Sequence, residues 1–171
     1  YTPFLDSLAK AGKFFAYHHA NGQRSIDAVP SILYSLPLLN ENSIINSPYE
    51  KNHFIGLPHV FGSLGYETYF FHGGHEGTMG FKRFTTHNGI KHYVGLEQYP
   101  YRDKDFDGTW GIWDESFLSF FAKTLTESKK PFFAGIFTLS SHQPYAIPEK
   151  YQGKFPKGDL PIHEAIGYTD F

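Results

Sequence analysis

The chain has 171 residues and a net charge of −2, and hydrophobic residues make up 40% and aromatic residues 19% of it. This length suits one domain with a sizeable core, and the composition is that of a globular protein and not of a disordered one. The charge balance and the lack of a basic run argue against a nucleic-acid partner. The absence of cysteine excludes disulfides, thiolate metal ligands and cysteine nucleophiles.

Helical and strand patterns alternate along the chain. Apolar residues at three- and four-residue spacing indicate helices, and short apolar or aromatic runs indicate strands. The predicted helices cover residues 3–11 (with Thr2 as N-cap and Gly12 as the stop), 25–36, 57–64, 79–86 and 114–127, and a last helix begins near residue 162. The predicted strands cover residues 14–17, 67–71 and 131–139, the last of these as a central strand, and residues 38–52, 87–110 and 145–161 are predicted to be irregular. This alternation predicts an α/β sandwich with a mostly parallel sheet.

Each predicted strand is followed by a polar cluster. The clusters are residues 21–27, 72–76 and 140–142. In open α/β sheets, ligands bind beyond the carboxyl ends of the strands. We therefore expect the three clusters to meet in one active site.

Ser25 is the foremost candidate for a catalytic residue. It lies where a polar turn becomes a helix, and the free N–H groups of a helix N-terminus favour an anionic phosphate or sulfate. Arg24 beside it could bind the oxygens of the same anion. The alternative is that Ser25 is an ordinary N-cap and Asp27 a first-turn charge, both common at helix starts.

Two histidines are candidates for contacts with a substrate. His142 follows a strand and could hydrogen-bond an oxygen or deliver a proton, or could be an ordinary loop residue. His72 precedes two glycines, which would let the backbone approach a ligand closely or would merely form a turn. The pairs 18–19 and 75–76 lack metal-ligand spacing. The turn sequence 107–110 is expected to be structural, and the aromatic residues Trp110, Trp113, Phe117, Phe120 and Phe121 are expected to pack in the core.

Several short motifs, in the same order and at similar spacing, resemble the lipoteichoic acid synthase/sulfatase branch of the alkaline phosphatase superfamily. They are Thr2-Pro3-Phe4-Leu5-Asp6-Ser7-Leu8, Asn21-Gly22-Gln23-Arg24-Ser25, Tyr69-Phe70-Phe71-His72-Gly73-Gly74, residues 131–144 ending in Ser140-Ser141-His142-Gln143-Pro144, and the closing segment 161–170. The resemblance spans nearly the whole chain. It implies a three-layer α/β sandwich of which residues 1–171 are the central part of one sulfatase-like catalytic domain, incomplete at both ends.

The resemblance also implies roles for individual residues. Ser25 falls where this family has its hydroxyl nucleophile, usually Thr, which also coordinates a divalent metal. His142 falls where the family has a histidine that contacts the substrate, and His72 and Arg24 are expected to contribute to substrate binding. The metal would be Mn, Zn or Mg. A metal can lower the pKa of a hydroxyl and neutralise phosphate charge, so that transfer proceeds through a covalent intermediate.

The chain departs from family patterns in two places. Arylsulfatases convert the Cys or Ser of a Cys/Ser-x-Pro-x-Arg motif to formylglycine, but Asp27 stands where that proline would be. We therefore expect an unmodified serine and phosphoryl chemistry. Synthases that transfer glycerol phosphate carry a Trp and an Arg where this chain has Met79 and Phe81, which argues against a polyglycerol-phosphate substrate.

The resemblance further implies that the remaining metal ligands, an acidic residue before Tyr1 and an Asp-His pair after Phe171, lie outside this chain. We therefore expect the chain alone to bind metal weakly and to be inactive. Membrane helices outside the chain would place the domain on the extracytoplasmic face of the cell membrane. The predicted substrate is a phosphate or sulfate ester of an envelope lipid or glycan. A hydrolase of soluble esters and a non-catalytic domain that binds anionic glycans or lipids remain as alternatives.

Overall fold

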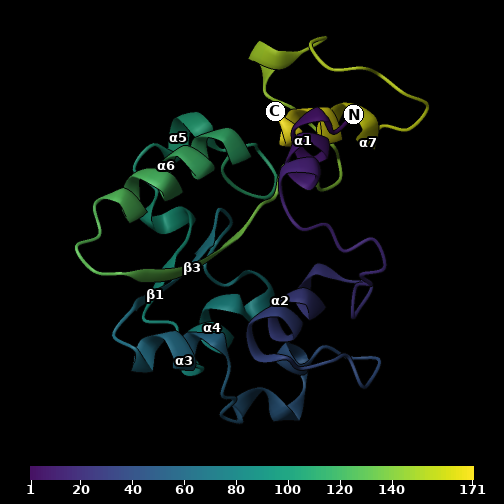
Figure 1. Cartoon of the computed structure of the whole chain (residues 1–171). Coiled ribbons are helices and arrows are strands. Elements are labelled where there is room, and N and C mark those ends of the chain that lie inside the picture. Colours follow the sequence, from purple (N-terminus) through teal and green to yellow (C-terminus); the bar gives the residue numbers. More distant parts are fainter.

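A parallel three-stranded sheet with the order β2-β1-β3 lies at the centre of the computed structural model, which describes residues 1–171 (Figure 1). The strands are β1 (Glu67–His72), β2 (His92–Val94) and β3 (Phe132–Phe137). The α-helices are α1 (Pro3–Ala11), α2 (Ser25–Tyr34), α3 (Leu57–Ser63), α4 (Phe81–His87), α5 (Arg102–Asp105), α6 (Asp114–Thr126) and α7 (Ile162–Asp170). Short 3-10 helices cover Ile44–Asn46, Pro48–Lys51, Thr78–Gly80, Leu96–Gln98 and Glu149–Tyr151.

Helices cover both faces of the sheet, which confirms the predicted three-layer α/β architecture. Successive side chains of a strand point to opposite faces, so Phe70 and Phe71 belong to different halves of the core. Phe70 lies in a buried cluster with residues of α2 and α4. Phe71 lies in a second cluster with Phe117 and Leu125 of α6. Figure 1 shows α5 and α6 on one side of the sheet and α3 and α4 on the other.

The predicted strand over residues 14–17 is wrong. The segment forms no ladder, and the side chains of Phe14, Phe15 and Tyr17 are 72%, 73% and 92% exposed. Aromatic residues favour a strand only where a neighbouring strand and a packed face receive them, and no other strand of the chain pairs with this segment. The polar cluster 21–27 therefore does not follow a strand.

Three further details of the strands and helices correct the sequence analysis. Residues 92–94, expected to be irregular, form β2, which pairs with β1 in the register Phe70↔Tyr93. β3 pairs only with β1 and is thus an edge strand here, not a central one. Helix α2 ends at Tyr34 and not at residue 36 as predicted, because Ser35 adopts a left-handed conformation with φ 54° and ends the helix.

The first and last helices pack together beside the sheet (Figure 1). Thr2 does not cap α1 with its side chain; instead the carboxylate of Asp170 in α7 accepts hydrogen bonds from the N–H groups of Phe4 (2.7 Å) and Leu5 (2.9 Å). A carboxylate at a helix N-terminus satisfies free amides and complements the helix dipole. α1 itself contributes no buried residue. No helix of the structure is both long and apolar enough to cross a bilayer.

Candidate active site

The carboxyl ends of β1 and β3 lie at the same edge of the sheet because the two strands are parallel. His72 is the last residue of β1, and the segment that contains His142 follows β3. The structure thus brings two of the three predicted polar clusters to one edge. The chain after β1 is packed tightly there: Gly74 pairs with Gly111, and a Cβ on Gly111 would lie 2.4 Å from the carbonyl oxygen of Gly73.

Asp114, which the sequence analysis did not single out, holds the segment after β3 in place. Its buried carboxylate accepts hydrogen bonds from the N–H groups of Leu139 (2.8 Å) and Ser140 (3.1 Å). The hydroxyl of Ser140 in turn accepts one from the N–H of Asp114 (3.0 Å). Burial raises the pKa of the Asp114 carboxyl, while these donors oppose the rise. In the sequence, the only sign of this role was the position of Asp114 at the start of the predicted helix 114–127.

His142 is exposed and lies against an indole ring. Its Nδ1 is 3.0 Å from the carbonyl oxygen of Gln143, which can only accept, so we assign the proton to Nδ1. Its Nε2 makes no hydrogen bond within the chain. Trp110 lies 4.2 Å from the imidazole between ring centroids, and its Nε1–H donates to the same carbonyl (2.6 Å). Trp110 was expected in the core but is 37% exposed, so that prediction is wrong.

The loop that carries Trp110 is built by Asp107. One carboxylate oxygen of Asp107 accepts from the N–H groups of Thr109 (2.7 Å), Trp110 (2.7 Å) and Gly111 (3.1 Å). This is the turn chemistry that the sequence predicts for residues 107–110. Its effect is to place an aromatic ring beside the predicted substrate histidine.

Ser25 is the first residue of α2, a helix of ten residues. Its side chain is exposed and makes no hydrogen bond, whereas the N-cap position belongs to Arg24, which makes no side-chain cap either. The reading of Ser25 as an ordinary N-cap is therefore wrong. The hydroxyl is free for chemistry at a helix N-terminus whose N–H groups favour an anion.

Arg24 is engaged with its own turn. Its guanidinium contacts both carboxylate oxygens of Asp27 at 3.2 and 3.3 Å and donates to the carbonyl oxygen of Glu41 at 2.9 Å. Asp27 is only 3% exposed, so this ion pair satisfies a carboxylate that would otherwise be buried alone. A substrate would have to share the guanidinium with Asp27 or displace it.

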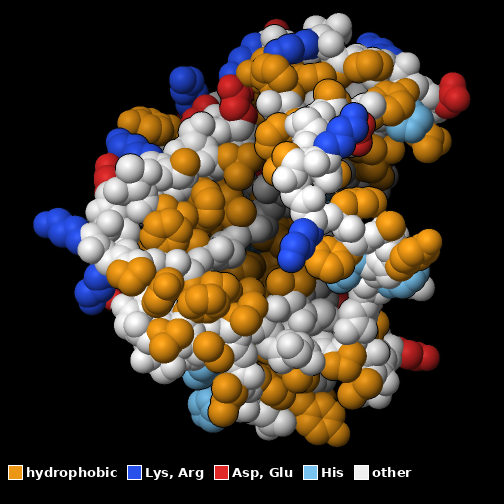
Figure 2. Space-filling view, in the orientation of Figure 1, with side chains coloured by type: hydrophobic (Ala, Val, Ile, Leu, Met, Phe, Trp, Pro, Cys, Tyr) orange, Lys and Arg blue, Asp and Glu red, His pale blue; other side chains and the backbone are white.

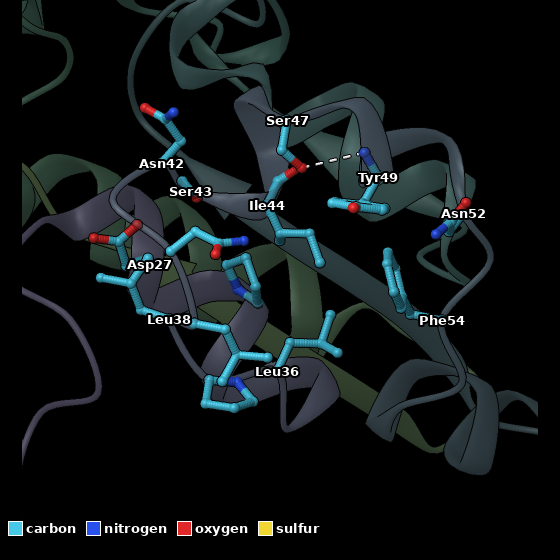
Figure 3. Close-up of a pocket in the computed structure, with 14 residues that line it drawn as sticks. Asp27, Leu36, Leu38, Asn42, Ser43, Ile44, Ser47, Tyr49, Asn52 and Phe54 are labelled. Atoms are coloured by element: carbon cyan, nitrogen blue, oxygen red, sulfur yellow. Dashed lines mark hydrogen bonds between the residues drawn. The ribbon is translucent and has the colours of Figure 1, made fainter.

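A pocket of about 420 Å³ opens beside α2 (Figure 3). Asp27 lies at one end of it and Phe54 at the other, while Leu36 and Ile44 point into the space between them. Several asparagine and serine side chains also line it, so the pocket offers both apolar and hydrogen-bonding surface. The segment 38–52, predicted as a loop, forms much of its wall.

His72 is buried completely. Its Nδ1 is 3.0 Å from the hydroxyl of Tyr93, and Phe81 and Phe137 pack edge-on against the ring. The other nitrogen, Nε2, is buried without any hydrogen-bond partner. Burial lowers the pKa of His72 from 6.5 to about 4, so the imidazole is neutral near pH 7.

This burial predicts a pH dependence of stability. Between pH 6.5 and about 4 the unfolded chain binds a proton at His72 that the folded chain resists, so stability falls as the pH drops through this window. We expect His72 to contribute about 3 kcal/mol to this fall in the free energy of unfolding. Urea unfolding across the window should show a shallower pH profile for His72→Gln than for wild type. The exposed His19→Gln variant should keep the wild-type profile, and parallel profiles for all three would contradict the prediction.

The three candidate side chains are not in direct contact. No hydrogen bond joins Ser25 to either histidine, and Asp27 and His142 line different pockets. Both α2 and the α1–α7 pair lie on the side toward which β3 runs (Figure 1). The surface is hollowed between these two parts, as Figure 2 shows. No group of three or more His, Asp or Glu side chains could hold a metal ion, so the residues of this chain do not by themselves form a metal site.

Comparison with solved structures defines the class of protein. A member of the alkaline phosphatase superfamily from Vibrio parahaemolyticus superposes with a TM-score of 0.86 at 28% identity, over 99% of this chain and 42% of that one. The lipoteichoic acid synthase LtaP from Listeria monocytogenes gives a TM-score of 0.83 at 21% identity, over 99% of this chain and 43% of that one. The fold is that of the alkaline phosphatase superfamily.

Sequence comparison gives the family within this class. The sulfatase family model matches residues 1–166, so the chain belongs to the sulfatase family. Lipoteichoic acid synthase 1 of Bacillus subtilis (strain 168) is 28% identical over 155 residues, and lipoteichoic acid synthase of Staphylococcus aureus (strain USA300) is 27% identical over 158. Each alignment covers 87% of this chain and 24% of the relative. The chain thus spans about a quarter of the length of these relatives, and the resemblance inferred from the motifs is confirmed.

Proposed function

We propose that this chain is the central part of the catalytic domain of a metal-dependent phosphotransferase or hydrolase in which Ser25 is the nucleophile. The observation that carries the proposal is the free, exposed hydroxyl of Ser25 at the start of the ten-residue helix α2. A serine at such a position, with a hydroxyl that makes no hydrogen bond, combines a nucleophilic oxygen with backbone amide groups that stabilise an anion. Membership of the sulfatase family supports an ester-cleaving or ester-transferring activity.

The substrate of this proposal is a phosphate ester of an envelope lipid or glycan. Ser25 is not followed by the proline of the formylglycine motif, which favours an unmodified hydroxyl and hence phosphoryl transfer over sulfate-ester hydrolysis. The names of the bacterial relatives point to synthesis of an envelope polymer. The domain would then act on the extracytoplasmic face of the membrane, held by helices outside this chain.

The proposed reaction has two in-line displacements. In the first, the Ser25 oxygen forms a bond to phosphorus, the bond to the leaving alcohol breaks, and the proton lost by the serine is balanced by one gained by the alcohol. In the second, an acceptor hydroxyl or water forms the new bond and frees Ser25. A divalent metal, when bound, would acidify the serine and neutralise charge. Ser25 would be the metal ligand that this chain supplies, and the other ligands would lie outside the chain.

The remaining side chains have supporting roles in this proposal. The exposed imidazole of His142 would contact a phosphate oxygen or leaving group, and His72 would bind a second oxygen when the glycine turn that covers its Nε2 moves aside. Arg24 would order the turn through Asp27 and lend a donor to the anion. The pocket beside α2 would hold the organic part of the substrate, since it offers apolar and amide surface and its lining includes Asp27, two residues after Ser25 on the same helix.

Trapping the covalent intermediate tests this proposal. The complete protein is incubated with a lipid-linked phosphodiester and Mn²⁺, quenched in acid and digested. We expect mass spectrometry to find the phosphorylated alcohol group on the peptide that contains Ser25, and none on the Ser25→Ala protein. Release of the group to water alone would identify a hydrolase, whereas its appearance on an added alcohol would identify a transferase. Binding of the ester without any covalent adduct or turnover would instead support the binding-domain alternative and overturn the proposal.

A further inference from the structure

The pair formed by His72 and Tyr93 combines complete burial with an unused polar atom. Tyr93 is 8% exposed, and its hydroxyl has His72 as its only hydrogen-bond partner, at 3.0 Å from Nδ1. On the other side of the same ring, Nε2 is sealed from solvent and has no partner. A buried polar group left unpaired costs about 1–3 kcal/mol, so such groups call for an explanation.

The position of Tyr93 follows from the sheet. β1 and β2 pair in the register Phe70↔Tyr93, and His72 lies two residues beyond Phe70 on the same face. Tyr93 and His72 are therefore diagonal neighbours across two parallel strands, a separation that long aromatic side chains can span. The contact depends on β2, the strand that the sequence did not predict.

The two neutral tautomers of His72 differ in how many buried polar groups they leave without a hydrogen-bond partner. If Nδ1 carried the proton, it would donate to the Tyr93 oxygen, and both the hydroxyl proton and the Nε2 lone pair would lack partners. If Nε2 carries the proton, the hydroxyl donates to Nδ1, and only the Nε2–H remains unpaired. The second arrangement leaves one polar group unsatisfied instead of two. Burial also lowers the pKa of His72 to about 4, so the doubly protonated form does not compete near neutral pH.

The unpaired Nε2 lies under the turn that follows β1. A Cβ on Gly74 would be 3.1 Å from Nε2 and 3.0 Å from the adjacent ring carbon, so only a residue without a side chain leaves room there. Phe81 and Phe137 fix the ring from two sides. The ring therefore has a fixed orientation, with its free nitrogen against a backbone of glycines.

We propose that Tyr93 is a positioning residue, whose hydroxyl donates to Nδ1 of His72 and so holds Nε2–H as a neutral hydrogen-bond donor, available to an anionic oxygen of the substrate when the glycine turn that covers it moves aside. This inference rests on the proposed function for its substrate, but the tautomer itself does not. A neutral donor suits a buried site, because it pairs with an anion without the cost of burying a second charge. Tyr93 would act only through His72 and would not touch the reacting atoms.

The direct test reads the tautomer by NMR. The complete protein is labelled with ¹⁵N in histidine only, and the His72 signals are identified by their loss in His72→Gln. We expect a pyridine-type Nδ1 and a pyrrole-type Nε2 at pH 7 in wild type, and a shift toward the opposite tautomer or a mixture in Tyr93→Phe. Tyr34→Phe is the matched control, since it removes another buried hydroxyl, which is bonded to the carbonyl of Thr85 and to no histidine.

Activity adds a second readout. We expect Tyr93→Phe to lower kcat/KM for the phosphodiester about 3- to 10-fold, the effect of weakening one hydrogen bond to the substrate, and Tyr34→Phe to leave it unchanged. A pyrrole-type Nδ1 in wild type, or a Tyr93→Phe spectrum equal to that of wild type, would overturn the inference. Failure of the proposed function is distinguishable, because full turnover by Ser25→Ala would refute the nucleophile while leaving the tautomer of His72 as measured.

Discussion

Replacement of Ser25 by alanine in the complete protein is expected to lower kcat by about a thousandfold or more. The variant lacks the only oxygen that the proposed mechanism can attach to phosphorus, and loss of a nucleophile removes a step that binding cannot replace. Substrate binding should change little, because the helix N-terminus and the neighbouring side chains remain. Initial rates with a phosphodiester substrate and Mn²⁺ measure this effect.

Two further variants control for changes in the helix itself. Ser25→Thr keeps a hydroxyl at the position and should retain activity within about tenfold of wild type, since both hydroxyls can act as nucleophiles. Ser31→Ala lies on the same helix, where its hydroxyl donates to the carbonyl of Leu36 (3.0 Å), and it should leave turnover unchanged. Equal rates for wild type and Ser25→Ala would exclude Ser25 as the nucleophile.

Replacement of Asp114 by alanine should cause the largest loss of stability at the sheet edge. It leaves the N–H groups of Leu139 and Ser140 buried without an acceptor, and each such group costs about 1–3 kcal/mol. We expect a total loss of about 3–5 kcal/mol in the free energy of unfolding, measured by urea denaturation. Asp114→Asn should lose about half of this, because the amide offers only one accepting oxygen.

Replacement of Asp114 by asparagine should also lower activity, because His142 follows closely after Leu139 and Ser140, the two residues that Asp114 holds in place. Small displacements of a group that positions substrate reduce turnover strongly, so kcat/KM should fall about tenfold or more in whatever fraction of Asp114→Asn remains folded. The control is Asp103→Ala, which removes a fully exposed carboxylate from α5 and should change stability by less than about 0.5 kcal/mol. An Asp114→Ala protein that unfolds at the wild-type urea concentration would show that the two hydrogen bonds contribute little.

The elements with strong local patterns were predictable from the sequence. The aromatic run of β1 and the near-continuous apolar run of β3 formed strands as expected, and the helical spacing of Phe117 and Leu125 marked α6 correctly. These patterns arise because an element that is buried on one or both faces carries apolar residues at regular spacing along the sequence. The placement of His72 and of the segment with His142 at the same edge of the sheet followed from the parallel order of these two strands.

The elements that depend on distant partners were not predictable in this way. β2 is three residues long and gains its identity only by pairing with β1, while residues 14–17 carry a strand-like pattern and find no partner in the chain. The contacts around the candidate functional residues could not be predicted, for the same reason. The ion pair of Arg24 with Asp27 and the carbonyl of Glu41, and the hydroxyl of Tyr93 beside His72, are contacts that composition and spacing do not encode.

The carboxylate of Asp170 at the start of α1 has a consequence for the order in which the chain assembles. The contact joins Phe4 and Asp170, residues separated by 166 positions, and α1 offers no buried side chain that could fix it earlier. During synthesis, α1 must therefore stay undocked until the ribosome has released α7. Of the helices in this chain, the earliest one to be synthesised is then among the last to reach its final place.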